Sequence, residues 1–490
     1  MDAVIAVNAD LAWMLTALAL LLLMIPGLAL FYGGMLGARN TLNMMVMVFG
    51  ALAVAAIVYI VYGYGFVHGP TMGGLGILGD PRGFFGMDSA VLTDDSGGGI
   101  GTAYFAIWFV MFAGITVAIV ASGGAGRMKL GGWITFVAVW LTLVYLPVAH
   151  WVFAADGFLL DKVGVIDFAG GTAVHMNSGT AALALALVLG ARRNRFERPH
   201  NVPQTMLGAG LLFVGWLGFN GSCALAAGHL VQVVVLNTIL AGCAGMLGYM
   251  LVEKLRQGHP TALGAATGMV AGLVAITPAA HTMGPLGALA TGAIGAAVAA
   301  LAISFKSRLK VDESLDAFMV HGLAGIAGTL CIVLFANPAA PAGIGGLLTG
   351  DGLSHALPEV IGILTTVGFS FVMTFAIAWV LDKTIGLRAP EQQEQLGLDQ
   401  AIHAETAYEI SLVQFDHGAF APRTAPVPAA SAPAAAGAAA SPAGSAGGQG
   451  ASGAGPVVRT EEAALAAPPE DEETLAAEAP ATPAPTAERG

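Results

Sequence analysis

The sequence predicts an all-α integral membrane protein with eleven transmembrane helices. Of its 490 residues, 56% are hydrophobic and only 10% are charged, against about 25% charged residues in an ordinary soluble domain. The hydrophobic residues come in runs of about 20, the length that a helix needs to cross a bilayer core of about 30 Å. These runs repeat through the first 385 residues, so the sequence excludes a soluble globular protein and predicts a chain surrounded by membrane lipid.

The predicted spans follow one another along the chain. The first is too long for a cleaved signal peptide and lacks a basic amino-terminal region, so we interpret it as a permanent span. The long connection at 66–101 is rich in Gly and Asp and predicts a surface loop. In order, the eleven spans cover residues 11–36, 41–65, 102–122, 130–149, 168–190, 203–222, 228–253, 261–278, 284–304, 317–336 and 355–384.

The basic residues predict the orientation of these spans. They collect in alternate connections, and cytoplasmic loops are the ones that carry an excess of Lys and Arg. Only Arg82 and Lys162 lie in the other set of connections, on the opposite side of the membrane. We therefore expect the N-terminus outside and the C-terminus inside. The cytoplasmic set consists of Arg39, Arg127, Lys129, Arg192, Arg193, Arg195, Arg198, Lys254, Arg256, Lys306, Arg308, Lys310, Lys383 and Arg388.

Charge and cysteine content exclude two further classes of protein. The net charge is −12 and the basic residues form no long stripe, which argues against a nucleic-acid partner. The three cysteines, Cys223, Cys243 and Cys331, all lie in apolar runs. Such cysteines are typical of small buried side chains and not of a secreted disulfide scaffold.

The composition changes after the last span and predicts three parts. Residues 1–385 form the membrane domain, and residues 386–420 form a polar cytoplasmic segment. Residues 421–490 are dominated by Ala, Pro, Gly and Ser. Such a composition cannot bury enough apolar surface to form a core, so we expect a disordered tail.

Two histidines are predicted at membrane depth, where an ionisable group is costly and indicates a functional site. His175 and His321 each lie in the last span of a block of five, spans 1–5 and 6–10. A block of five helices crosses the membrane an odd number of times, so the next block of five has the opposite orientation in the membrane. Such inverted repeats bring corresponding helices together at the midplane. We expect the two imidazoles to bond to each other; the alternative for each is a backbone carbonyl partner. Asp167 and Asp316 precede these helices and suit N-caps.

Several motifs resemble those of a known family. They are GLALFYGG (27–34), DFAGGTAVH (167–175), GWLGFNGS (215–222), ITPAA (276–280) and DAFMVHG (316–322). In this order they are similar to the signature stretches of the Amt/Mep/Rh ammonium transporter family, nearest the Amt branch, over about residues 10–410. The resemblance implies a homotrimer in the cell membrane, with a narrow hydrophobic pore through each subunit. It implies a transporter without a cofactor, and not an enzyme.

The resemblance also assigns roles to the residues of the pore. By motif position, His175 and His321 correspond to the twin histidines of the lumen. Phe112 and Phe219 correspond to the stacked phenyl gate above them, and Trp216 to a residue lining the pore near the histidines. Asp316 is expected to be structural.

The predicted recruitment site departs from the family. The family uses a Trp and a Ser to hold the cation at the external mouth, and here Phe153 takes the Trp position. Cys223 takes the Ser position, with Ser222 one residue earlier. A phenyl face still attracts a cation, although less well than an indole does, and a thiol is a weak acceptor. Asp167 adds a long-range pull on a cation. Phe109 stands where the family often has Gln.

The function that the resemblance implies is the uptake of ammonium. The cation is recruited at the mouth, loses its proton between the two phenyl rings, and crosses as ammonia along the histidines. Two alternatives are an ammonium sensor with little flux and an Rh-like channel for neutral ammonia or carbon dioxide. An enzyme with Asp167 and His175 as acid and base would lack a nucleophile or metal cluster. The cytoplasmic segment resembles the family's regulatory segment, which can meet a PII-type protein, and Ala404 replaces a common Gly there.

Overall fold

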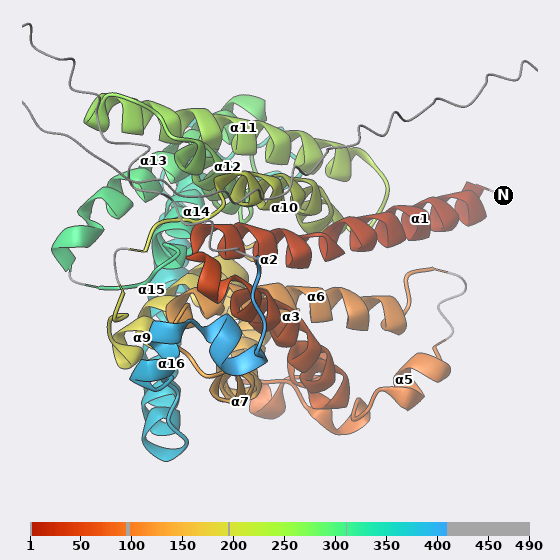
Figure 1. The fold of residues 1–490 in the computed structure, drawn as a ribbon. Coiled ribbons are helices and arrows are strands. Elements are labelled where there is room, and N and C mark those ends of the chain that lie inside the picture. Colours follow the sequence, from red (N-terminus) through yellow and green to blue (C-terminus); the bar gives the residue numbers. More distant parts are fainter. Residues whose placement is uncertain (1, 95–98, 195–196, 310, 409–490) are drawn as a thin grey trace, which may run out of the picture. The chain divides into compact units, whose positions relative to one another are not determined.

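The computed structural model describes residues 2–94, 99–194, 197–309 and 311–408. Within these ranges every regular element is a helix, accompanied by two isolated β-bridges, Thr71 with Gly79 and Met128 with Arg388. Figure 1 shows the long helices running side by side as a bundle. The predicted tail at 421–490 and the end of the predicted cytoplasmic segment lie outside the described residues.

Sixteen α-helices form the described part of the chain. Short π-helical or 3-10 turns join several of them into longer runs. The α-helices are α1 (Asp2–Leu22), α2 (Met24–Met35), α3 (Thr41–Val58), α4 (Tyr64–His68), α5 (Asp88–Leu92), α6 (Thr102–Val120), α7 (Leu130–Trp140), α8 (Leu146–Phe153), α9 (Asn177–Leu189), α10 (Val202–Ser222), α11 (His229–Gln257), α12 (Ala262–Ile276), α13 (Pro285–Leu309), α14 (Ala324–Phe335), α15 (Ala356–Thr384) and α16 (Glu391–Leu396).

Ten helical runs in the described part of the chain are long and apolar enough to cross a membrane. They correspond to ten of the predicted spans, and the remaining one, at 261–278, corresponds to α12, which has only 15 residues. Ten of the eleven predicted spans are confirmed as long apolar helical runs, and the eleventh crossing stays a prediction. The ten runs are Asn8–Met35, Ala38–His68, Thr102–Gly124, Leu130–Phe153, Gly171–Leu189, Val202–Ser222, His229–Gln257, Pro285–Lys306, Phe318–Phe335 and Ala356–Thr384.

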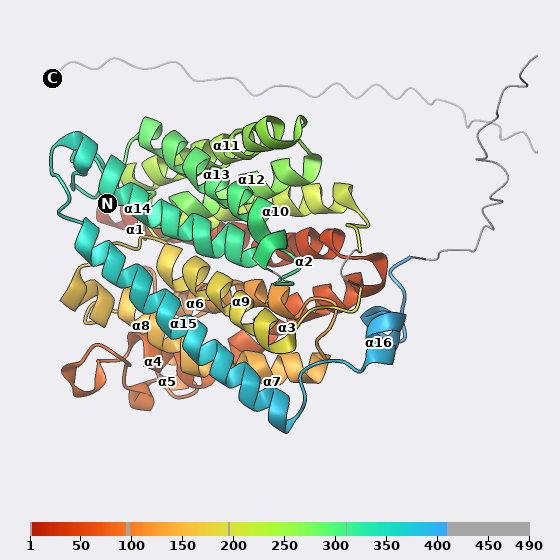
Figure 2. The ribbon, with the colours of Figure 1, turned by 90° about the vertical axis from the view of Figure 1, so that its left-hand side faces the viewer.

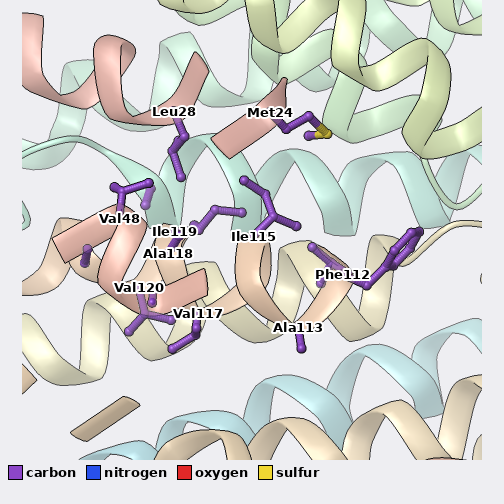
Figure 3. Packing of buried hydrophobic residues seen from close by; sticks show 14 of the residues in the cluster. Met24, Leu28, Val48, Phe112, Ala113, Ile115, Val117, Ala118, Ile119 and Val120 are labelled. Atoms are coloured by element: carbon purple, nitrogen blue, oxygen red, sulfur yellow. The ribbon is translucent and has the colours of Figure 1, made fainter. Parts of the chain in front are cut away.

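The helix α6 lies at the centre of the core because it is apolar on every side. Every one of its residues from Trp108 to Val120 is buried. Figure 3 shows Ile115 and Ile119 of α6 opposite Leu28 of α2, with Phe112 further along the same helix. Burial of this helix fixes the direction in which Phe112 points.

Small residues let the helices of the bundle approach closely. A Cβ atom added at Gly208 of α10 would lie 2.3 Å from the backbone nitrogen of Phe31 in α2. A Cβ atom at Gly328 of α14 would lie 1.9 Å from the carbonyl oxygen of Ala275 in α12. Glycine is required at both positions because any side chain would force the helices apart.

The residues after α15 return to the bundle. We call residues 386–408 the C-terminal segment. The Asp399 carboxylate accepts hydrogen bonds from the backbone N–H groups of Leu42 and Asn43, at 3.0 and 2.8 Å. The Asn40 side chain accepts another from the N–H of Leu398 at 3.0 Å. These bonds attach the segment to the start of α3, where α16 lies at one end of the bundle (Figure 2).

Candidate functional site

Asp167 organises the backbone that leads to the first histidine. Its carboxylate accepts hydrogen bonds from the N–H groups of four consecutive residues, Gly170 to Ala173, at 2.6 to 3.1 Å. The predicted capping role of Asp167 is confirmed. Burial raises the pKa of its carboxyl, and the four N–H groups act in the opposite direction because they stabilise the charged form. The cap begins the wide π-helical turn Gly171–Met176, which carries His175.

The corresponding cap before the second histidine is made by a different residue than expected. The Asp316 carboxylate pairs with Lys306, and the Asp316 backbone has a φ of +60°. Glu313 instead accepts a hydrogen bond from the N–H of Phe318 at 3.2 Å and also bonds to the hydroxyl of Ser122. The expectation that Asp316 is the N-cap is therefore wrong, because the left-handed backbone and Lys306 direct its carboxylate elsewhere. His321 lies in the following π-helical turn, Phe318–Leu323.

The two histidines face each other in the interior of the bundle. Their Nδ1 atoms are 3.2 Å apart, and the ring centroids are 5.3 Å apart. Both side chains are buried, with exposed fractions of 0% for His175 and 4% for His321. Nε2 of His175 has no hydrogen-bond partner within the described ranges. A neutral imidazole has one donor and one acceptor nitrogen, so a single shared proton satisfies the contact between the rings.

Aromatic rings continue the column on one side of the histidines. The rings of Phe112 and Phe219 are stacked, with centroids 4.3 Å apart and an interplanar angle of 11°. Phe219 in turn lies 5.9 Å from the ring of His175. Trp216 stacks on His175 at 5.1 Å, and its indole N–H donates to the hydroxyl of Thr277 at 2.9 Å. The predicted gate and pore residues therefore lie in one buried stack.

The predicted recruitment residues lie beside this stack, but they differ in whether their polar atoms already have hydrogen-bond partners inside the protein. The ring of Phe153 is 6.2 Å from that of Phe112. The Ser222 hydroxyl is fully buried, accepts from the indole N–H of Trp108 at 2.8 Å and donates to the Phe219 carbonyl at 3.1 Å. The Cys223 thiol donates to the same carbonyl at 3.4 Å. The Ser222 hydroxyl therefore already has both its donor and its acceptor partner inside the protein.

Two residues near the site were missed by sequence reasoning. His68 was expected in a loop, but it ends α4 and packs on Phe109, with ring centroids 4.2 Å apart. Its Nε2 atom lies 2.9 Å from the hydroxyl of Tyr59. Trp108 packs on Phe112 at 5.3 Å. The spacing of Trp108 and Phe112, one helical turn, was a signal for the second contact, whereas nothing local in the sequence placed His68 inside the helix.

A cavity of about 510 Å³ opens next to these rings. It lies between the end of α4 and the end of α8. Its lining residues are His68, Gly69, Pro70, Phe153, Ala154, Ala155 and Asp156.

Comparisons with known proteins agree on one family. The sequence profile of the Ammonium Transporter Family matches residues 12–408. An ammonium transporter of Corynebacterium glutamicum is 48% identical over 410 residues, which are 82% of this chain and 90% of the relative. The crystal structure of Saccharomyces cerevisiae Mep2 has a TM-score of 0.71 at 30% identity, covering 78% of this chain and 90% of that one. A structure titled Sensor Amt Protein has a TM-score of 0.73 at 27% identity, covering 82% and 100%.

The match over residues 12–408 includes each helix that contributes to the histidine pair and the stacked rings. Together with the ten apolar spans, these similarities identify a multi-pass protein of the cell membrane. The chain belongs to the ammonium transporter family.

Proposed function

We propose that this chain takes up ammonium through a hydrophobic pore that runs past the stacked phenyl rings and the two histidines. The observation that carries the proposal is the buried column formed by Phe112, Phe219, His175 and His321, in which each ring contacts the next. No charged side chain belongs to this column. It offers aromatic faces and imidazole nitrogens, which suit a small molecule able to donate hydrogen bonds.

The chemistry of such a column selects ammonium over potassium. The two ions are close in size and charge, so a cavity alone discriminates poorly between them. Only ammonium can lose a proton and continue as a neutral molecule. Loss of water between Phe112 and Phe219 disfavours the charged form, so the cation releases its proton there. Neutral ammonia then passes along His175 and His321, whose nitrogens accept and donate hydrogen bonds and are able to relay the proton.

The entrance of the pore is assigned to the recruitment residues. In this proposal the face of Phe153 attracts the cation through its quadrupole. Asp167 adds a long-range attraction, because its carboxylate lies in the connection before the His175 turn. Ser222 and Cys223 form the opposite wall, near the stacked rings.

The proposal includes the topology and the assembly. Residues 1–385 form the transport domain, with eleven crossings arranged as two inverted five-helix repeats and a final helix. The N-terminus lies outside, and residues 386–420 form a regulatory segment inside. The functional unit is a homotrimer with one pore per subunit, and a PII-type protein binds at the cytoplasmic face. The phase of the basic residues supports the orientation, and the resemblance to the family supports the assembly and the partner.

The test is ammonium-evoked current and uptake in proteoliposomes that contain the purified protein, with potassium as the control ion. We expect saturable ammonium transport and none with potassium. His321→Ala should abolish selective ammonium conduction, because it removes one of the two facing imidazoles. His259→Ala is the matched control, since His259 is exposed in a connection, and it should leave transport unchanged. Unchanged flux and selectivity in His321→Ala would contradict the role of the pair.

A sensor with little flux is the second candidate. It is favoured by the similarity to the structure titled Sensor Amt Protein and by Phe153 and Cys223 at the positions of the family's Trp and Ser. The same assay separates the candidates. Binding without uptake supports the sensor, and uptake without current supports an Rh-like channel for neutral ammonia or carbon dioxide.

A further inference from the structure

The cavity of about 510 Å³ beside α4 and α8 is joined to the proposed pore by aromatic contacts. Phe153 lines the cavity and lies 5.7 Å from Phe109 and 6.2 Å from Phe112, measured between ring centroids. Phe112 is one of the two stacked rings. A cation held in the cavity would therefore contact Phe153, whose ring neighbours the Phe112–Phe219 stack.

One carboxylate lines this cavity. The Oδ2 atom of Asp156 accepts a hydrogen bond from the N–H of Thr71 at 2.9 Å, which fixes the side chain at the cavity. Asp156 forms no ion pair within the described ranges. The two basic residues predicted on the same side of the membrane are each paired with another acid, Arg82 with Asp80 and Lys162 with Asp161. Among the described residues, Asp156 therefore has no basic side chain in direct contact, although Lys162 lies near enough to attract it electrostatically.

His68 also lines the cavity. The contact between its Nε2 atom and the Tyr59 hydroxyl, at 2.9 Å, fixes the ring, and the packing on Phe109 at 4.2 Å holds its face. The cavity thus combines one carboxylate with two fixed rings. The phenyl face of Phe153 attracts a cation within about 6 Å, and the carboxylate adds a Coulomb attraction.

The hydroxyl and the thiol at the end of α10 already have hydrogen-bond partners. The Ser222 hydroxyl has both a donor and an acceptor partner inside the protein. The Cys223 thiol donates to the Phe219 carbonyl. Because Phe replaces Trp and Cys replaces Ser at the entrance, Asp156 adds cation affinity to the attraction from the Phe153 face and from Asp167.

We propose that Asp156 concentrates ammonium at the outer entrance, in the cavity whose walls are Phe153 and His68. The inference rests on the proposed function, because it names the residue that sets the affinity of the same pore. The ligand class is a small monovalent cation with N–H donors. Asp156 acts before the stacked rings and takes no part in the steps beyond them.

The experiment compares Asp156→Asn with the wild-type protein in proteoliposomes. The half-saturating ammonium concentration should rise about five-fold, which is the loss of about 1 kcal/mol of attraction, while the maximal rate stays the same. Asn keeps an acceptor oxygen for the Thr71 N–H, so the loop remains in place. The effect should shrink as the ionic strength rises, because salt screens an accessible charge. Asp156→Glu should keep the half-saturating concentration close to that of the wild type.

Asp88→Asn is the matched control. Asp88 is exposed in the connection at 66–101, which is predicted on the same side of the membrane, and it does not line the cavity, so removing its charge should leave the half-saturating concentration unchanged. An equal rise in both variants would show a general surface-charge effect and overturn the proposal. No rise in Asp156→Asn would overturn it as well.

A second measurement separates this inference from the proposed function. Ammonium chloride should stabilise the detergent-solubilised protein against heat more than sodium chloride does, because a bound ligand stabilises the folded state. In Asp156→Asn the same stabilisation should require about five-fold more ammonium. If the wild type binds in this way but carries no flux, the transport proposal fails and the entrance site stands. If the ammonium dependence is the same in the variant and the wild type, the entrance site fails.

Discussion

Ala404 holds a backbone conformation that glycine adopts more readily. Its φ is +56°, in the left-handed region, and its N–H donates to the carbonyl of Gln400 at 3.2 Å. The residue ends the turn Asp399–His403, whose first member is bonded to the start of α3. A Cβ atom in this conformation costs about 1 kcal/mol, which explains in physical terms why a Gly is common at this position in the family that the chain resembles.

Ala404→Gly should therefore make the C-terminal segment bind more tightly to the bundle. We expect slower amide hydrogen exchange at Leu398 and Asp399, by about two- to five-fold, because removal of the Cβ atom relieves up to about 1 kcal/mol of strain. Ala401→Gly is the control, since Ala401 lies inside the same turn without a positive φ, and exchange there should become faster. Faster exchange in Ala404→Gly would contradict the account.

At the same scale, the histidine pair and the rings beside it could be predicted from the sequence, but the positions of Asp316 and His68 could not. His175 and His321 were found because each is an ionisable residue inside an apolar run, where the energetic cost marks it. Asp316 was misplaced because its side-chain direction depends on a left-handed φ and on Lys306. His68 was misplaced because the helix continues to the end of α4, beyond the last strongly apolar residue.

The helix α15 contributes one buried carboxyl group to the connection that carries Asp167. Glu359 is fully buried near the start of α15, and its Oε1 atom accepts a hydrogen bond from the N–H of Ile166 at 2.9 Å. This bond joins α15 to the residue that precedes Asp167. Figure 2 shows α15 lying beside α9, and the Ser370 hydroxyl of α15 donates to the carbonyl of Asn177, the first residue of α9, at 2.8 Å. The helix therefore supports both ends of the segment from Ile166 through His175 into α9.

Glu359→Leu should destabilise the protein, because it leaves the buried N–H of Ile166 without an acceptor at a cost of about 1–3 kcal/mol. Glu359→Gln should be much milder, since its amide oxygen still accepts the bond. The measurement is the Tm of both variants in the same detergent, with the Leu variant expected clearly below the Gln variant. Equal Tm values would show that the bond to Ile166 does not support this connection.

At the scale of elements, the positions of the helices followed from the sequence because a membrane span is defined by the length of an apolar run. The predicted spans agree with ten helical runs, and differences are confined to ends such as His68. The interruptions within the runs were not predicted. The π-helical turns at Tyr59–Gly63 and Leu141–Tyr145 depend on packing between helices, which leaves no periodic signal in one sequence.

At the scale of the whole described bundle, charged residues join the C-terminal segment to distant connections. Arg388 donates to the carbonyls of Leu189 and Ala191, at 2.9 and 2.8 Å, and pairs with Glu394 at 2.8 Å. Arg192, which follows Ala191 in the same connection, in turn binds both oxygens of Asp312 at 3.0 Å. The segment therefore contacts the end of α9 as well as the start of α3, and it lies on the face that carries the predicted cytoplasmic loops.

This placement gives the PII proposal a concrete test. The full-length protein in cell membranes should capture a PII-type protein in a pull-down whose strength depends on nitrogen supply. A chain that ends at Tyr408 should capture it equally well, because it keeps the whole C-terminal segment and its contacts with the bundle. Capture that is absent under every nitrogen condition would contradict the proposed partner, and capture lost on shortening to Tyr408 would assign the binding to the residues that follow.

The wide turns that carry His175 and His321 have a consequence for insertions and deletions. A π-helical turn contains one residue more than an α-helical turn, and each residue of an α-helix rotates the following side chains by about 100°. Deleting one residue from either turn, for example Ala173, would restore the narrower winding and swing the adjoining segment away from its partner. The meeting of the two imidazoles is therefore encoded in the number of residues between fixed points of the backbone, as well as in the histidines themselves.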